Sequence, residues 1–130
     1  VLFRSFIQDL SEEDHRAQRE NLEQETLAIF DKLREGKEDL SPLDIKRIKD
    51  IATGLLQILK QNQLKIDNWR DKEGTRSAVE TTIHNYLYNE DTGLPIDSYT
   101  EEEVKEKSNV IYMHIFEKYP RLPSPYYEAA

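Results

Sequence analysis

Apolar side chains recur at intervals of three and four residues along most of the chain, which is the spacing of an amphipathic α-helix. Such stripes run through residues 22–33, 45–59, 79–87 and 104–119, and a shorter one falls in residues 3–10. The strict alternation of apolar and polar residues that would indicate strands is nearly absent. The pattern therefore predicts an all-α fold without a sheet.

Capping residues indicate where two of these helices begin. Ser41 is a favoured N-cap residue, Pro42 suits the first helical position, and Asp44 suits the positive end of the helix dipole. Thr100 and Glu103 have the spacing of a capping box, in which each side chain accepts a hydrogen bond from the other's backbone N–H. Each signal predicts a helix directly after it.

The first forty residues carry further helix signals. A stripe-bearing segment at 1–10 predicts a short helix or the end of a longer one, and Ser11 can cap the next, highly charged helix. Asn21 and Gln24 repeat the capping-box spacing before the next helix. Gly36 stands where the left-handed residue that follows a helix is commonly a glycine. With these segments, the expected total is five or six helices.

The only tryptophan opens the stretch around which we expect the other helices to pack. Asp67 or Asn68 can cap a helix that begins at Trp69 and continues through the stripe at 79–87. Gly74 lies inside this helix and can break or kink it.

The stripe at 45–59 is too wide for a single packing seam, which predicts that this helix is the most buried. Gly54 lies within it and costs about 1 kcal/mol relative to alanine, unless a neighbour packs closely against it. We expect residues 1–119 to form a single compact bundle. Residues 120–130 contain three prolines and no periodicity, so we expect an extended C-terminal tail there.

Composition narrows the class of protein. A chain of 130 residues is enough for one domain, and the absence of cysteine excludes disulfides and thiolate metal sites. No apolar run approaches the ~20 residues of a membrane helix. We therefore expect a cytoplasmic protein without a membrane partner. The chain starts at Val1 within an amphipathic stretch, which suggests a piece of a longer protein.

The net charge of −8 disfavours autonomous binding to nucleic acid, because an acidic surface is repelled by phosphate. The charge is unevenly distributed, however. Residues 42–79 carry more basic than acidic side chains, whereas residues 9–41 and 80–119 are strongly acidic. A binding site for an acidic partner is therefore best sought in the middle third.

Catalytic and metal chemistry is not predicted. Glu80 and His84 share a helix face, but no third ligand lies near them, so a structural role is expected for the histidine. Glu-x-Lys occurs at 35–37 and 103–105, outside any predicted strand, whereas a magnesium nuclease needs these residues on adjoining strands. We expect no catalytic residue, metal site or cofactor in this segment.

Trp69, Arg70, Lys72 and Arg76 are the candidate partner contacts. Tryptophan and arginine are enriched at interface hot spots, and a basic cluster suits an acidic protein surface or a DNA backbone. The competing interpretation is structural. The three cations can pair with carboxylates of the same stretch, and the tryptophan can belong to the core.

Five short motifs occur in one order, with Tyr99 before the last. They are LAIFDKL at 27–33, LLQILK at 55–60, LKIDNWR at 64–70, TRSAV at 75–79 and VIYMHIF at 110–116. Together they resemble the C-terminal helical domain of the restriction (R, motor) subunit of type I restriction-modification enzymes. The resemblance covers roughly Phe3 to Tyr119. Gly74 departs from the family pattern, which would have a polar helix former there.

The resemblance implies a parent subunit that is an ATP-dependent type I site-specific deoxyribonuclease. Its nuclease domain and two helicase-like lobes, with their ATP and magnesium, would lie outside this chain, which matches none of their motifs. The C-terminal domain would dock onto the methyltransferase and specificity subunits, and DNA would be reached through the complex. Two alternatives stay open: a domain that contacts DNA directly, and an unrelated helical interaction domain.

Overall fold

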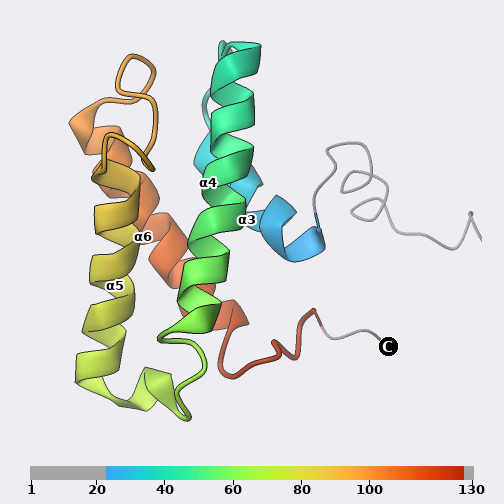
Figure 1. The fold of residues 1–130 in the computed structure, drawn as a ribbon, viewed down its shortest axis with the longest axis vertical. Helices are drawn as coiled ribbons and strands as arrows, with labels where there is room; N and C mark the ends of the chain where they lie inside the picture. Colours follow the sequence, from blue (N-terminus) through green and yellow to red (C-terminus); the bar gives the residue numbers. More distant parts are fainter. Residues whose placement is uncertain (1–22, 128–130) are drawn as a thin grey trace, which may run out of the picture.

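The computed structural model describes residues 23–127, and within this range it contains four α-helices, one short 3₁₀ helix and no strand. The α-helices are α3 (Gln24–Arg34), α4 (Pro42–Gln61), α5 (Glu73–Tyr88) and α6 (Glu101–Lys118), and the 3₁₀ helix η1 spans Trp69–Asp71 (Figure 1). The all-α prediction is confirmed for this part of the chain. The two short helices expected before residue 20 lie outside the described residues.

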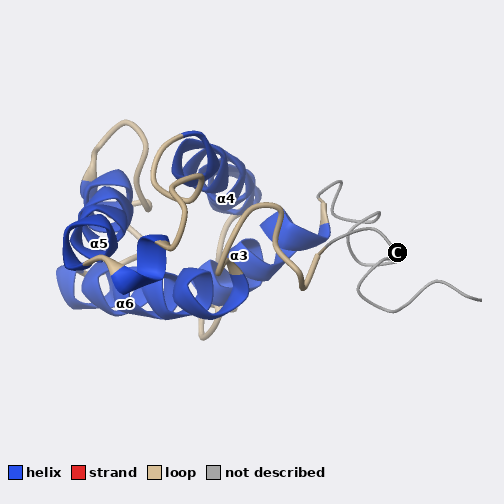
Figure 2. Ribbon diagram, turned by 90° about the horizontal axis from the view of Figure 1, so that it is seen from below, coloured by secondary structure: helices blue, strands red, loops and turns tan. Residues whose placement is uncertain are grey.

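The four α-helices form a closed ring of contacts. α3 packs against α4, α4 against α5, α5 against α6, and α6 against α3. In Figure 1, α4 and α5 stand side by side while α6 slants behind them. Figure 2 shows from below how α6 runs along one side of the bundle, from α5 toward α3. Each helix thus buries its stripe against two neighbours.

The apolar stripes meet in one core. Its largest fully buried side chains are Trp69, Tyr119 and Phe30. α4 contributes six buried apolar residues, more than any other described helix, as its wide stripe predicted. Most of the other predicted inner-face positions are also buried; they are Ile29, Leu33, Val79, Ile83, Leu87, Val104, Ile111 and Ile115. Four further stripe positions are only partly buried, namely Ile45, Ile58, Tyr86 and Phe116, and Met113 is exposed.

Two helices begin at their predicted caps. The Asp44 N–H donates to the Ser41 hydroxyl at 3.1 Å, with Pro42 at the start of α4. Thr100 and Glu103 form a complete capping box: the Glu103 N–H donates to Thr100 Oγ1 at 3.1 Å, and the Thr100 N–H donates to Glu103 Oε1 at 2.9 Å. These contacts join residues only three positions apart, so local sequence is sufficient to specify them.

α3 has one end as predicted and one end that differs. The helix begins at Gln24 with Glu23 in the N-cap position, and Glu23 makes no side-chain capping bond. Asn21, the predicted cap, lies outside the described residues. At the other end, Gly36 has a φ angle of 81°, the left-handed conformation that lets the chain leave the helix.

The prediction of one helix from Trp69 onward is wrong. η1 is a single turn, Lys72 has an extended backbone, and α5 begins directly after it. The break precedes Gly74, which lies in the first turn of α5 with open space at its Cβ position. The break therefore does not fall at the glycine, which is itself helical.

The predicted caps of the Trp69 helix are also wrong. Asn68 occupies the N-cap position of η1 but has a left-handed φ of 56° and makes no side-chain capping bond, and Asp67 lies before it. The physical reason is tertiary. η1 is held at the carboxyl end of α6 through the indole of Trp69, whereas α5 must lie along the length of α6 to bury its own stripe. The extended backbone at Lys72 allows both.

The loop between α5 and α6 is non-helical, as predicted, and it is fixed to α4. Arg47 donates from Nε to the Gly93 carbonyl and from Nη2 to the Glu90 carbonyl, both at 2.7 Å. The Ser98 hydroxyl donates to Asp44 Oδ2 at 2.6 Å. These bonds hold the loop against the amino-terminal half of α4.

Beyond α6, residues 120–127 contain bends and turns, and Tyr127 stacks on Tyr119 with ring centroids 5.9 Å apart. Residues 128–130 lie outside the described range. The extended tail and the domain boundary at residue 119 stay predictions.

Gly54 has the close neighbour that its position in α4 requires. A Cβ there would overlap the Tyr86 hydroxyl and approach Tyr86 Cζ to 3.3 Å. Tyr86→Phe removes the hydroxyl that the new Cβ would overlap. The free energy of unfolding after Gly54→Ala should therefore be about 1 kcal/mol higher, relative to each parent protein, in the Tyr86→Phe background than in the native chain. Chemical denaturation of the four proteins measures this coupling.

Gly74→Ala is the matched control, because nothing lies within 4 Å of its Cβ position. Its effect should be the same in both backgrounds. Equal coupling at Gly54 and Gly74 would contradict the packing explanation.

Candidate interaction site

The four candidate contacts lie together at one end of the bundle. Trp69 and Arg70 belong to η1, Lys72 links η1 to α5, and Arg76 is in the first turn of α5. We call these four residues the η1 corner. It lies at the lower end of the molecule in Figure 1, next to the carboxyl end of α6.

Trp69 is fully buried beneath this corner. Its Nε1–H donates to the Tyr119 carbonyl at 2.6 Å, and its ring meets Phe116 edge-on at a centroid distance of 6.1 Å. Tyr119 is the C-cap residue of α6, where carbonyl groups have no partner within the helix. The indole therefore completes the end of α6.

Arg70 serves the same helix end. Its Nη1 donates to the Phe116 carbonyl at 2.9 Å, and its guanidinium carbon lies 5.2 Å from the centre of the Phe116 ring. A cation is favoured at this position, because the carboxyl end of a helix carries a partial negative charge. Arg70 is thus half-buried and held in one geometry.

Arg76 and Lys72 complete the corner. Arg76 Nη1 donates to the Arg70 carbonyl at 2.6 Å, which ties α5 to η1. Lys72 is exposed. Within residues 23–127, none of the three cations of the corner forms an ion pair with a carboxylate. The expected pairing with neighbouring acids is therefore not what holds these side chains.

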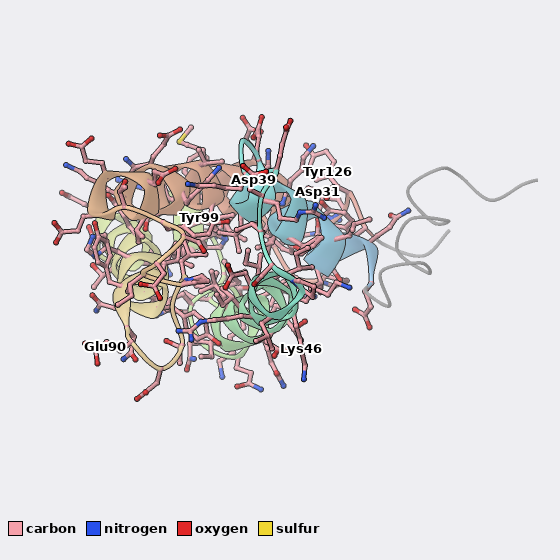
Figure 3. All side chains as sticks on the ribbon, turned by 90° about the horizontal axis from the view of Figure 1, so that it is seen from above. Asp31, Asp39, Lys46, Glu90, Tyr99 and Tyr126 are labelled. Carbon is pink, nitrogen blue, oxygen red and sulfur yellow. The ribbon has the colours of Figure 1, made fainter. Side chains whose placement is uncertain are left out.

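The carboxyl end of α3 is completed in a similar way. The Tyr99 hydroxyl donates to the Leu33 carbonyl at 2.7 Å, and Lys107 Nζ donates to the Glu35 carbonyl at 2.6 Å. Burial, with smaller contributions from Glu103 and Asp44, raises the pKa of Tyr99 to about 12. Figure 3 shows Tyr99 inside the bundle. It remains a neutral donor at physiological pH.

Sequence reasoning missed the structural roles of Tyr99 and Lys107. For Lys107 a signal existed, since it falls between Val104 and Ile111 on the buried side of α6. A lysine in such a position needs a buried acceptor.

Histidine positions differ in their surroundings. His84 is exposed and packs against Tyr88, with ring centroids 4.2 Å apart. His114 is only 6% exposed, and its Nε2 has no hydrogen-bond partner. Burial, followed by the charges of Lys32 and Lys118, lowers the pKa of His114 to about 4. Among residues 23–127, no three or more potential ligands are grouped so that they could hold a metal ion.

One family model matches this chain, over residues 5–111. Its description is the C-terminal part of proteins like the endonuclease subunit of the type I restriction enzyme HindI. The chain belongs to this family. No curated protein matches the chain, and no solved structure does. The resemblance noted in the sequence is thereby confirmed: this is the C-terminal domain of a type I restriction enzyme R subunit.

In the described part of this restriction-subunit domain, every helix is too short or too polar to cross a membrane.

Arg70 and Lys72 should differ sharply in their contribution to stability, although both are basic residues of the η1 corner. Arg70→Gln removes a charged donor from the Phe116 carbonyl and should lower the free energy of unfolding by about 1–2 kcal/mol. Lys72→Gln, at an exposed position, should change it by less than about 0.5 kcal/mol. Urea denaturation measures both, and equal losses would refute the assigned role of Arg70.

The buried His114 should make the stability of the domain depend on pH. Its folded pKa of about 4 lies below its ordinary value of 6.5, so the unfolded state binds the proton more readily. Protonation of His114 therefore favours the unfolded state. The contribution of His114 to the free energy of unfolding is greatest above pH 6.5 and decreases, by up to about 3 kcal/mol, as the pH falls toward 4.

Denaturation at several pH values between 4 and 7 measures this effect. His114→Gln should flatten the dependence, whereas the exposed control His84→Gln should leave it unchanged. Identical profiles for the two variants would show that carboxylates alone are responsible.

Proposed function

We propose that this domain docks the restriction subunit onto the methyltransferase and specificity subunits of the same enzyme. It would thereby link the DNA-translocating motor and the nuclease to that core. The η1 corner carries the proposal, because it presents three cations without carboxylate partners in the described structure. Because the chain belongs to an endonuclease subunit family of type I restriction enzymes, the restriction enzyme is the assembly in which such a contact would be made.

The geometry of the corner suits recognition of a protein surface. Arg70 and Arg76 are already held by hydrogen bonds to backbone carbonyls. Their ordering therefore adds little to the entropic cost of binding. Lys72 stands exposed beside them and can reach a carboxylate of the partner. Trp69 supports this arrangement from beneath, where it fixes η1 to α6.

We also propose that this domain contributes no catalytic residue. The reaction of the parent subunit, an ATP- and magnesium-dependent site-specific deoxyribonuclease, would take place in its other domains, and the complex would act in the cytoplasm. The packed helices of the domain would act as a passive coupler, through which the position of the motor is communicated to the methyltransferase.

Direct contact with DNA is the second candidate function, and the same three cations would serve it. The net charge of −8 weighs against it, because long-range repulsion from phosphate opposes the approach of the domain. Phosphate contacts would also make binding depend steeply on salt concentration.

Lys72→Glu tests the docking proposal, since the Lys72 side chain is exposed and makes no hydrogen bond or ion pair within the described residues. Titration of the native and variant chains with the assembled methyltransferase and specificity subunits should show at least a roughly fivefold loss of affinity, about 1 kcal/mol. Lys46→Glu is the matched control. It makes the same charge change at an exposed position in the first half of α4, which begins at the upper end of the bundle in Figure 1, whereas η1 lies at the lower end.

An equal loss with both variants would mean that only net charge matters, and no loss with either would refute the proposed surface. A parallel titration with duplex DNA at two salt concentrations decides the alternative. Tight binding that weakens steeply with salt, and that Lys72→Glu reduces, would favour direct DNA contact.

A further inference from the structure

The α6 helix presents a row of large side chains next to the η1 corner. The Phe116 ring meets Trp69 edge-on and lies beneath the guanidinium of Arg70. Its centroid is 6.2 Å from that of Tyr112, which precedes it by one helical turn. Met113 stands three residues before Phe116 and is therefore its neighbour on the helix surface. We call Tyr112, Met113 and Phe116 the α6 strip.

The α6 strip is accessible to solvent. Met113 is 55% exposed, although it is a large apolar side chain, and Tyr112 and Phe116 are partly buried. Asn109 and Glu117, one turn to either side of Met113, are exposed as well. Figure 2 shows α6 along one side of the bundle, with α4 and α5 on its inner side. Within the described residues, this outward part of α6 is thus a helix face without a packing partner.

Two arginines lie beside the α6 strip, one toward each end. Arg70 stands over Phe116. Burial, followed by the charge of Glu80, raises the pKa of Tyr112, and Arg76 opposes this shift, so Arg76 and Glu80 both lie near Tyr112. Within the described residues, each arginine donates from one nitrogen to a backbone carbonyl. A guanidinium has five N–H groups, so both arginines keep donors for a carboxylate.

The η1 corner by itself is too small for a stable interface. Specific protein–protein interfaces bury about 800 Å² on each partner, from roughly 20–30 residues. The docking surface must therefore extend onto a neighbouring element. Interface centres are enriched in aromatic residues, methionine and arginine. The α6 strip has this composition, whereas no exposed position of α5, which the structure describes in full, carries a large apolar side chain.

We propose that the docking surface continues from the η1 corner onto the α6 strip and binds a segment of the methyltransferase and specificity subunits in which a carboxylate stands beside apolar side chains. The carboxylate accepts hydrogen bonds from Arg70 and Arg76, and the apolar side chains cover the α6 strip. Apolar contacts around the ion pair exclude water from it, which strengthens the pairing. This inference rests on the proposed function and adds the chemistry of the partner.

The single methionine allows a direct measurement, because a chain labelled at the methionine methyl carbon gives one resonance, from Met113. In the free chain this methyl should be accessible to a soluble paramagnetic probe. Addition of the assembled methyltransferase and specificity subunits should protect it. Leu43→Met supplies a matched second resonance, which should stay accessible, since Leu43 is 80% exposed at the start of α4, at the opposite end of the bundle (Figure 1).

The outcomes separate this inference from the docking proposal. An accessible Met113 methyl in a complex that Lys72→Glu still weakens would overturn the inference and leave docking at the η1 corner standing. Equal protection of both methyl groups would also overturn it. If the subunits do not bind the native chain, both proposals fail. Protection of Met113 by duplex DNA and not by the subunits would replace the protein partner with DNA.

Two substitutions test the two parts of the recognition. Met113→Ser removes an apolar contact and should weaken binding to the subunits about fivefold or more, whereas Leu43→Ser, the matched control, should leave it unchanged. Arg76→Lys keeps the charge but loses the planar fork of donors, and it should weaken binding to a similar extent. Urea denaturation checks that each variant is folded. Native affinity for Met113→Ser would refute the apolar contact, and native affinity for Arg76→Lys would refute the carboxylate.

Discussion

The carboxyl ends of α3 and α6 impose the constraint on which this fold depends. The last carbonyls of a helix have no partner within it, and an unsatisfied carbonyl is costly where the helix end is covered by protein. In this domain the missing donors come from distant parts of the sequence. Trp69 and Arg70 serve α6, and Tyr99 and Lys107 serve α3. Each of these bonds joins residues 46 to 72 positions apart.

This constraint explains why the residues that stand out in the sequence have two kinds of role. Trp69 and Arg70 look like interface residues, and they are also the side chains that fix η1 to the end of α6. Arg76 in turn fixes α5 to η1. Within the described residues, none of the cations of the corner is paired with a carboxylate, and Arg70 and Arg76 are already held by backbone carbonyls. Such an arrangement supports a docking surface, because the cations need little reorganisation when a partner binds.

The sequence by itself determined the features that depend on near neighbours. The helix class, the inner faces, the caps at Ser41 and Thr100, and the exit at Gly36 all rest on residues within one or two turns of each other. The order of the five motifs was also sufficient to indicate the family, which the match over residues 5–111 confirmed.

Only the tertiary structure decided the break at Lys72, the donors at the helix ends and the burial of His114. A periodic pattern predicts that a side chain faces inward, but it does not predict which carbonyl group accepts its hydrogen bond. That depends on how elements far apart in the sequence come together in the folded chain. Local pattern therefore specified each helix, and long-range hydrogen bonds and packing specified how the helices end and meet.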